Sequence, residues 1–247
     1  MVKFTFNIAE TAIGVTCLHE STKDYCSGYL TDAEPDIEIT VTQEDIDYER
    51  ARAEETTEIP REKLVTYDDD YFEPLSLYRQ IAEAMFDRDT ILFHGSAIAV
   101  DGQTFLFTAP SGTGKSTHGE LWRRVLPEMG HRVVTVNDDK PLIIIREDGV
   151  RICGTPWNGK HNLGENIILP LKAICSLSRA EETHVEKVSF EEMLPVLFKQ
   201  TYRSSSPQKI AKTMQLLNTL SKHVDFYKLG CNMKRSAARI AYNGMKD

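Results

Sequence analysis

A glycine-rich stretch at 109–117, Ala-Pro-Ser-Gly-Thr-Gly-Lys-Ser-Thr, carries the clearest chemical signal in the sequence. It matches the phosphate-binding loop (P-loop) pattern G-x-x-x-x-G-K-[ST] except that alanine stands in place of the first glycine. Gly112 and Gly114 allow the backbone to turn several N–H groups toward phosphate oxygens. Lys115 would neutralise the β- and γ-phosphates, and the Ser116 hydroxyl would ligate Mg²⁺. The residues expected to bind the nucleotide are Ser111, Gly112, Thr113, Gly114, Lys115, Ser116 and Thr117.

Two adjacent acids, Asp138 and Asp139, follow the largely apolar segment Val-Val-Thr-Val-Asn at 133–137. A P-loop needs an acid from elsewhere in the chain to help hold its metal. Two neighbouring carboxylates allow a division of labour, because one can bind Mg²⁺ while the other accepts the proton of an attacking hydroxyl. The alternative interpretation is a solvated turn ahead of Lys140-Pro141.

The elements that would position these residues alternate between strands and helices. Apolar segments predict strands at 91–100 and 104–108, joined by a hairpin turn at Asp101-Gly102, and a second hairpin at 142–153. An amphipathic helix is expected directly after the loop. Apolar spacing, capping residues and proline signals predict the remaining elements: helices over 74–88, 189–202, 206–223 and 233–243, and a strand over 224–231. Interleaved strands and helices indicate an α/β fold.

The segment from Ile91 to Asp139 resembles the phosphoenolpyruvate-carboxykinase type of P-loop protein. In particular it is similar to HPr kinase/phosphorylase and its relatives. The shared features are a strand opening with His94-Gly95, a hairpin, a Ser-Gly-x-Gly-Lys-Ser loop and a later Asp-Asp. The resemblance is specific over about 91–160 and continues more diffusely toward the C-terminus. It implies an α/β fold with a P-loop nucleotide-binding core of the carboxykinase/HPr-kinase type, here with a β-rich N-terminal portion.

The resemblance also implies roles for individual residues. His94 is expected near the transferred phosphate, and Asp138 is expected as the base or a metal ligand, with Asp139 supporting it. The metal would be held by Ser116 together with Asp138 or Asp139. With Lys115 as the third catalytic residue, the chain would use ATP and Mg²⁺ to phosphorylate a hydroxyl, a Ser or Thr of a protein or peptide. HPr kinases form hexamers, so a homo-oligomer is left open.

The composition of the chain argues against several other classes of protein. The chain of 247 residues carries a net charge of −8, and 31–70 alone holds fifteen Asp and Glu against four Lys and Arg. An acidic chain is poorly suited to nucleic-acid phosphates. No segment approaches the ~20 apolar residues that span a bilayer, and Glu10 interrupts any signal-peptide core. The five cysteines form no CxxC pair, so neither a disulfide framework nor a zinc site is indicated. We expect a cytoplasmic protein without nucleic-acid or membrane partners.

The organisation along the chain follows from these patterns. Residues 1–88 are predicted to form a β-rich portion packed on the core, and 89–247 a kinase-like P-loop domain. The acidic stretch at 31–70 is interpreted as a solvated face, with a docking surface for a basic partner as the alternative. The triplet Asp68-Asp69-Asp70 is interpreted as a solvated loop, and His118 as a solvent-facing residue of the P-loop helix.

Three further side chains are weaker candidates. Trp157 could stack on a base or anchor a loop, Lys160 could touch phosphate, and Arg203 could supply positive charge to the transition state. Two other functions stay open beside the protein kinase: a small-molecule kinase or ATPase, and a non-catalytic sensor in which bound ATP orders a surface for a partner.

Overall fold

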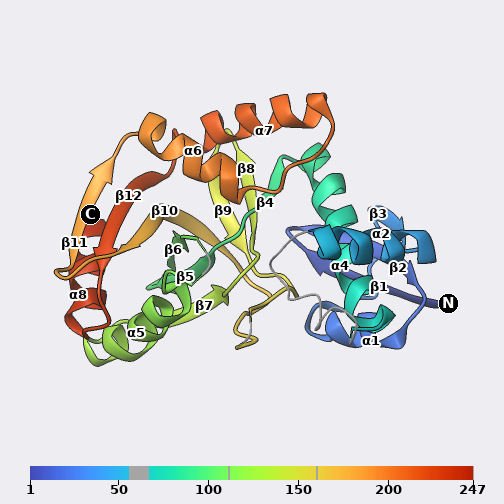
Figure 1. Cartoon of the computed structure of the whole chain (residues 1–247), viewed down its shortest axis with the longest axis horizontal. Coiled ribbons are helices and arrows are strands. Elements are labelled where there is room, and N and C mark those ends of the chain that lie inside the picture. The colour runs from blue at the N-terminus through green and yellow to red at the C-terminus, as the bar shows by residue number, and fades with distance from the viewer. Residues whose placement is uncertain (56–66, 111, 160, 247) are drawn as a thin grey trace. The chain divides into compact units, whose positions relative to one another are not determined.

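A computed structural model of the chain describes residues 1–55, 67–110, 112–159 and 161–246 (Figure 1). The chain divides into two compact units, Met1–Met85 and Phe86–Asp247. Both units combine strands and helices, so the protein belongs to the mixed α/β class. In the described part of the chain, no helix combines the length and apolar character needed to cross a bilayer.

The N-terminal unit is built on a three-stranded sheet in the order β1-β2-β3. β1 (Val2–Ile8) and β2 (Thr11–Cys17) form an antiparallel hairpin, and β3 (Ile37–Thr40) pairs parallel with β2. The helical elements of this unit are α1 (Glu20–Tyr25), the 3₁₀ turn η1 (Ser27–Tyr29), α2 (Gln43–Glu55) and α4 (Asp69–Met85).

The interpretation of Asp68-Asp69-Asp70 as a solvated loop is wrong for its last two residues. Asp69 and Asp70 form the first turn of α4, where a negative charge is favoured by the positive end of the helix dipole. Asp69 pairs with Arg50 of α2, and the Asp70 carboxylate lies 3.0 Å from His19 Nδ1. These acids therefore serve helix initiation and packing within the unit.

The C-terminal unit is organised around a curled mixed sheet in the order β4-β8-β9-β10-β6-β5-β7, with β12 paired to both β10 and β11. β10 (Ile168–Arg179) joins its two halves, because it starts antiparallel to β9 and continues parallel to β6 and β12 (Figure 1). The other strands are β4 (Thr90–Leu92), β5 (Ser96–Val100), β6 (Gln103–Thr108), β7 (Val133–Asn137), β8 (Leu142–Arg146), β9 (Gly149–Cys153), β11 (His184–Val188) and β12 (Asp225–Cys231).

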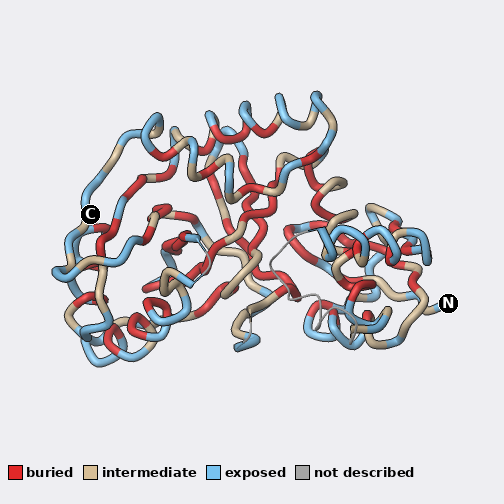
Figure 2. Tube along the Cα trace, in the orientation of Figure 1, coloured by how far each residue is buried: buried red, intermediate tan, exposed pale blue. Residues whose placement is uncertain are grey.

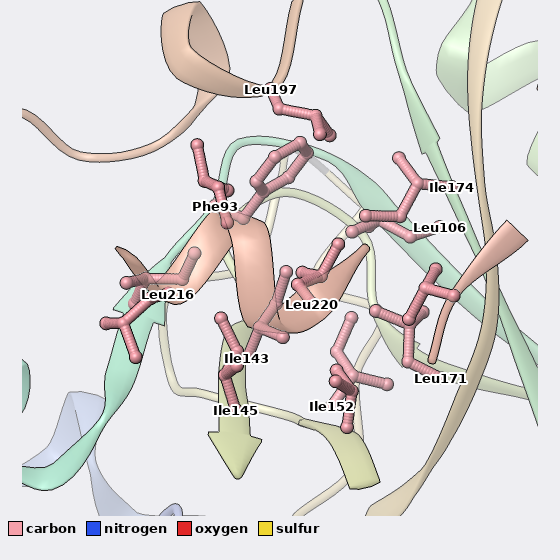
Figure 3. Close-up of a cluster of buried hydrophobic side chains, with 14 of the residues drawn as sticks. Phe93, Leu106, Ile143, Ile145, Ile152, Leu171, Ile174, Leu197, Leu216 and Leu220 are labelled. Carbon is pink, nitrogen blue, oxygen red and sulfur yellow. The ribbon is translucent and has the colours of Figure 1, made fainter. Parts of the chain in front are cut away.

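Two clusters of buried apolar side chains pack in this unit, and Figure 2 shows that long stretches of its chain are buried. α5 (Lys115–Glu128) and α8 (Ser236–Met245) pack on one cluster, whose centre is the fully buried Trp122. α6 (Phe190–Gln200) and α7 (Pro207–Leu220) contribute leucines to the other. Figure 3 shows this second cluster, in which Leu197, Leu216 and Leu220 meet Ile143, Ile152 and Ile174.

Both predicted hairpins are confirmed. β5 and β6 are joined at Asp101 (φ 51°) and Gly102 (φ 86°), the left-handed pair that a two-residue hairpin turn requires. β8 and β9 form the second hairpin. The helices predicted over 74–88, 189–202, 206–223 and 233–243 correspond to α4, α6, α7 and α8 with small shifts of their ends.

The strand predicted over 91–100 is interrupted. β4 ends at Leu92 and β5 begins at Ser96, and the intervening Phe93-His94-Gly95 leaves the regular ladder. Gly95 passes so close to β6 that a Cβ atom there would lie 2.8 Å from the Phe107 carbonyl oxygen. Periodicity could not reveal this break, because Phe93 is fully buried and continues the apolar pattern. The short link from β4 to β5 carries His94.

Candidate active site

The P-loop connects β6 to α5, as the sequence predicts. Gly112 (φ 75°) and Gly114 (φ 120°) adopt conformations that side chains disfavour, which explains the glycines at these two positions. The first helical hydrogen bond runs from the His118 N–H to the Gly114 carbonyl oxygen (2.9 Å). The N–H groups of the three preceding residues therefore have no acceptor within the helix. Such a helix start is suited to bind an anion.

The neighbouring residues that were expected to bind the nucleotide lie on either side of this helix start. Thr113 donates its N–H to the Pro110 carbonyl oxygen (3.2 Å), while Ser116 and Thr117 are exposed on the first turn of α5. Ser111, also expected to bind the nucleotide, lies outside the described residues. The binding roles of these residues stay predictions.

Lys115 folds back over the loop. Its ammonium donates to the Ala109 carbonyl oxygen at 2.9 Å. Burial lowers the pKa of Lys115, the Asp139 carboxylate raises it, and the Lys140 ammonium lowers it again. The charges of Asp139 and Lys140 therefore lie near the loop lysine.

His94 is fixed at the same site by its backbone. Its N–H donates to the Gln200 carbonyl oxygen (2.8 Å), and its carbonyl accepts from the Thr108 hydroxyl at the end of β6 (3.1 Å). The next residue, Gly95, donates its N–H to the Asp139 carbonyl oxygen (2.9 Å). The His94 ring then lies with Nε2 3.3 Å from Asp139 Oδ1. The structure thus brings His94 together with Asp139, whereas the expected position of His94 near a transferred phosphate stays a prediction.

The two adjacent acids have opposite environments. Burial raises the pKa of Asp139, but the hydrogen bond with His94 and the neighbouring Lys140 ammonium lower it more, to about 2. Burial likewise raises the pKa of Asp138, and the N–H groups of Gly159 and Leu163 offset this only in part, so that the net shift is upward. Asp139 is therefore held as a carboxylate, whereas Asp138 binds a proton more readily than an ordinary aspartate.

Asn137 organises this pair, and the sequence analysis assigned it no role. Its side chain is fully buried. The amide oxygen accepts from the N–H groups of Asp139 (2.9 Å) and Lys140 (2.6 Å), and the amide nitrogen donates to the Thr155 carbonyl (3.1 Å) and to Asn158 Oδ1 (3.0 Å). Asn137 is a positioning residue, since it ties the acidic turn to the loop after β9. A polar residue closing an apolar strand just before two acids was the available signal.

The loop after β9 supports Asp138 directly. The Gly159 N–H donates to Asp138 Oδ1 (2.6 Å). Trp157 is only 3% exposed, which favours an anchoring role over stacking on a base. Lys160 lies outside the described residues. Arg203 is exposed and follows Tyr202, whose N–H donates to the Leu92 carbonyl oxygen (2.9 Å), so the backbone at 202 lies next to the end of β4.

The interpretation of His118 as solvent-facing is wrong. The ring is 2% exposed, lies against Phe107, and accepts a hydrogen bond from Trp122 Nε1 at Nε2 (2.8 Å). Burial lowers the pKa of His118 to about 4. The residue is neutral and structural, and it forms part of the packing between α5 and the sheet. The helical spacing of His118 and Trp122 could have indicated a shared buried face.

The metal assignment of Ser116, Asp138 and Asp139 stays a prediction. Among the described residues, no group of three or more His, Cys, Asp or Glu side chains could hold a metal ion. A hydroxyl and one or two carboxylates are oxygen ligands of the kind that Mg²⁺ takes, and Mg²⁺ completes its shell with phosphates and water. The residues therefore fit a nucleotide-bound Mg²⁺ better than a resident ion.

Arg179, at the end of β10, is a neighbour of the loop that the sequence analysis missed. Its guanidinium donates from Nη2 to the Gly112 carbonyl oxygen (2.6 Å) and from Nε to that of Thr113 (3.4 Å). An arginine 64 positions after the loop lysine carries no local signal, because only strand pairing brings β10 beside β6.

Comparisons with known proteins show a weak structural similarity only. Neither a known protein family nor a curated protein matches the sequence. Among solved structures, the HPr(Ser) kinase/phosphatase from Coxiella burnetii is similar over 62% of this chain and 95% of that chain, with 14% identity and a TM-score of 0.33. This similarity is too distant to show a family or an activity, so the functional argument rests on the residues of the site.

Proposed function

We propose that this protein is an ATP-dependent kinase that transfers the γ-phosphoryl group to a hydroxyl acceptor, a Ser or Thr of a protein or peptide. The observation that supports this most is that Asp139, whose carboxylate is bound by His94 and Lys140, lies close enough to Lys115 to raise its pKa, with Asp138 as the preceding residue in the chain. Phosphate binding alone needs the loop and its lysine. Asp138, which binds a proton more readily than an ordinary aspartate and precedes Asp139, adds the group that a transferase needs and a binding protein does not.

In this proposal, the loop N–H groups and Lys115 bind the phosphates of ATP. Ser116 and one of the two aspartates would hold Mg²⁺, which, when bound, neutralises charge on the phosphate oxygens. His94 and Lys140 keep Asp139 ionised and fix its orientation. The chain's own contribution is therefore mostly positioning and electrostatic stabilisation, as phosphoryl transfer requires.

Asp138 acts as the general base. The acceptor hydroxyl oxygen forms a bond to the γ-phosphorus, the bond from that phosphorus to the β–γ bridging oxygen breaks, and ADP leaves. The hydroxyl proton passes to the Asp138 carboxylate. A raised pKa makes Asp138 a stronger base than an exposed aspartate, and it still leaves the group ionised at neutral pH when the shift is moderate. The rate should therefore fall in acid as Asp138 becomes protonated.

The acceptor class rests on the resemblance of the motifs between Ile91 and Asp139 to those of HPr kinases. A small metabolite is the competing acceptor, and a non-catalytic ATP sensor is the competing function. The intact set of Lys115, Ser116, Asp138 and Asp139 favours a catalyst over a sensor, because a sensor has no use for a base.

The test uses γ-labelled ATP, Mg²⁺, the purified protein and a lysate of the source cell, with Lys115→Ala as the control. After incubation, the mixture is separated by size. Label in a protein or peptide that depends on Lys115 is the expected result. Label in a small molecule would move the proposal to a metabolite kinase. Label in free phosphate only, or ATP binding without turnover, would contradict the kinase and support an ATPase or a sensor.

A further inference from the structure

A cavity of about 470 Å³ adjoins the P-loop. Its lining comes from the loop and from the end of β10: Pro110, Gly112, Thr113, Leu177, Ser178 and Arg179. β10 runs parallel to β6, and Ser176 pairs with Thr108 at the last position of the shared ladder. The next residues of β10 therefore continue alongside the loop. The cavity thus lies past the carboxyl end of β6 and beside the last residues of β10, at the edge of the sheet where open α/β sheets bind their ligands.

The lining combines an apolar floor with a planar cation. Leu177 is 3% exposed and Pro110 adds a second apolar side chain. The Arg179 guanidinium is held by its two hydrogen bonds to the Gly112 and Thr113 carbonyl oxygens. A guanidinium fixed in this way offers a flat cationic face to an aromatic heterocycle. Ser178 supplies a hydroxyl at the rim.

We propose that this cavity binds the base and ribose of the nucleotide whose phosphates the P-loop holds. The proposal rests on the proposed function, because it requires a nucleoside triphosphate at Lys115. The nucleoside is joined to the phosphates and has to leave the loop at one side. At Gly112 and Thr113 the loop itself forms the cavity wall, so a chain of phosphates bound at the loop can continue into it. The cavity volume falls within the ~300–1,000 Å³ typical of small-molecule sites.

The test compares two ligands that share phosphates but differ in the nucleoside. ATP and inorganic tripolyphosphate are titrated, each with Mg²⁺, into the wild-type protein and into Ser178→Trp by calorimetry. Ser178 is exposed, so the indole is expected to fill the cavity without disturbing the core. The same substitution at Ser27, an exposed serine of the N-terminal unit, is the matched control. Ser178→Trp should raise the Kd for ATP at least about tenfold and leave that for tripolyphosphate within about twofold.

A second variant, Arg179→Lys, keeps the charge and removes the planar group. It should raise the Kd for ATP by about two- to fivefold, which corresponds to an exposed cation–π contact. The Kd for tripolyphosphate should again be unchanged. Unchanged ATP affinity in both variants would overturn the nucleoside site. An equal rise in the Kd of both ligands would also overturn it, because the substitutions would then affect phosphate binding at the loop and not the nucleoside. If the wild-type protein binds neither ligand, the proposed function itself fails, and this is seen before any variant is made.

Discussion

The Asp and Glu residues of the two units differ in number and in what their carboxylates contact. The N-terminal unit, residues 1–85, holds twenty Asp and Glu against seven Lys and Arg, whereas 86–247 holds seventeen against twenty-two. Among the described residues of the first unit, two acids are buried, Glu49 and Glu73. Both make contacts that hold the unit together. Glu49 pairs with Arg79 (2.5 Å). The two acids that we propose take part in catalysis, Asp138 and Asp139, lie instead in the basic unit.

The hydrogen bonds of the buried Glu73 carboxylate are structural. It accepts hydrogen bonds from the N–H groups of Leu18 (2.6 Å) and His19 (3.1 Å) and from the Thr22 hydroxyl (2.5 Å), which together cap the start of α1. Asp138 is less fully compensated, since burial still shifts its pKa upward. The contrast indicates that local solvation, rather than the density of acids, decides which carboxylate can exchange a proton.

The largest effect is expected at the P-loop. Lys115→Ala removes the cation that we propose binds the phosphates, and it should lower phosphoryl transfer by about 10²–10³-fold or more. Lys115 lies in the loop and not in a core cluster, so the melting temperature should stay close to that of the wild type. Turnover of labelled ATP and a thermal melt measure the two quantities. Wild-type turnover in Lys115→Ala would place the nucleotide elsewhere.

A structural effect of several kcal/mol is expected in the other unit. Glu73→Gln turns one acceptor oxygen into a donor that faces N–H and O–H groups, and it should destabilise the N-terminal unit by about 3 kcal/mol. Hydrogen exchange at the Leu18 and His19 amides reports this locally, and ATP affinity should not change. Glu44→Gln, at an exposed acid of α2, is the control. Normal protection of both amides in Glu73→Gln would refute the capping role.

The buried His118 makes the stability of the C-terminal unit depend on pH. Its pKa is lowered from 6.5 to about 4 in the folded protein, so the unfolded chain binds more protons between these values. The contribution is fully present above pH 6.5 and is lost as the pH falls toward 4, by about 3 kcal/mol in all. His118→Gln keeps an acceptor for Trp122 Nε1 and should flatten this part of the curve in denaturant titrations. An unchanged curve would show that other groups cause the slope.

Asp139 affects the stability of the protein at lower pH than His118 does. Its pKa is lowered from 3.8 to about 2, so its stabilising effect of about 2 kcal/mol is present above pH 3.8 and is lost as the pH falls toward 2. Asp139→Asn should remove this loss and lower stability at neutral pH, because the hydrogen bond with His94 and the Lys140 pair are weakened. Stability of this variant measured at pH 7 and pH 3 separates the two effects.

The smallest effects are expected at the exposed acids of α2. Glu44→Gln and Glu54→Gln remove charge from a solvated surface, and each should change stability by no more than about 0.5 kcal/mol. ATP affinity should not change either. A large loss of transfer in these variants, with intact folding, would instead support the alternative that the acidic stretch docks a partner.

The sequence predicted most elements because their signals are local. The hairpin at Asp101-Gly102, the capping serine of α6 and the apolar spacing of α7 each depend on neighbours within a few residues. The P-loop was recognisable for the same reason. The interruption at His94 was missed because burial of Phe93 keeps the apolar pattern of a continuous strand.

The remaining parts of the site depend on tertiary contacts. Asn137 gains its role only when the loop after β9 folds against it, and Arg179 reaches the P-loop only through the pairing of β10 with β6. The burial of His118 follows from packing against Phe107 and Trp122. The opposite pKa shifts of Asp138 and Asp139 could be read only in part from adjacent residues such as Lys140, since burial and the hydrogen bonds with His94 and Gly159 come from the tertiary fold.

The most direct measurement compares Asp138→Asn with the wild-type protein in transfer of label from γ-labelled ATP to the acceptor, at matched ATP occupancy. Asparagine keeps the size of the side chain and cannot take the hydroxyl proton. The account predicts ATP binding within about twofold of the wild type and a loss of transfer of about 10²–10⁴-fold. Transfer at the wild-type rate by Asp138→Asn would contradict the assignment of the base and, with it, the contrast between the two acids on which the account depends.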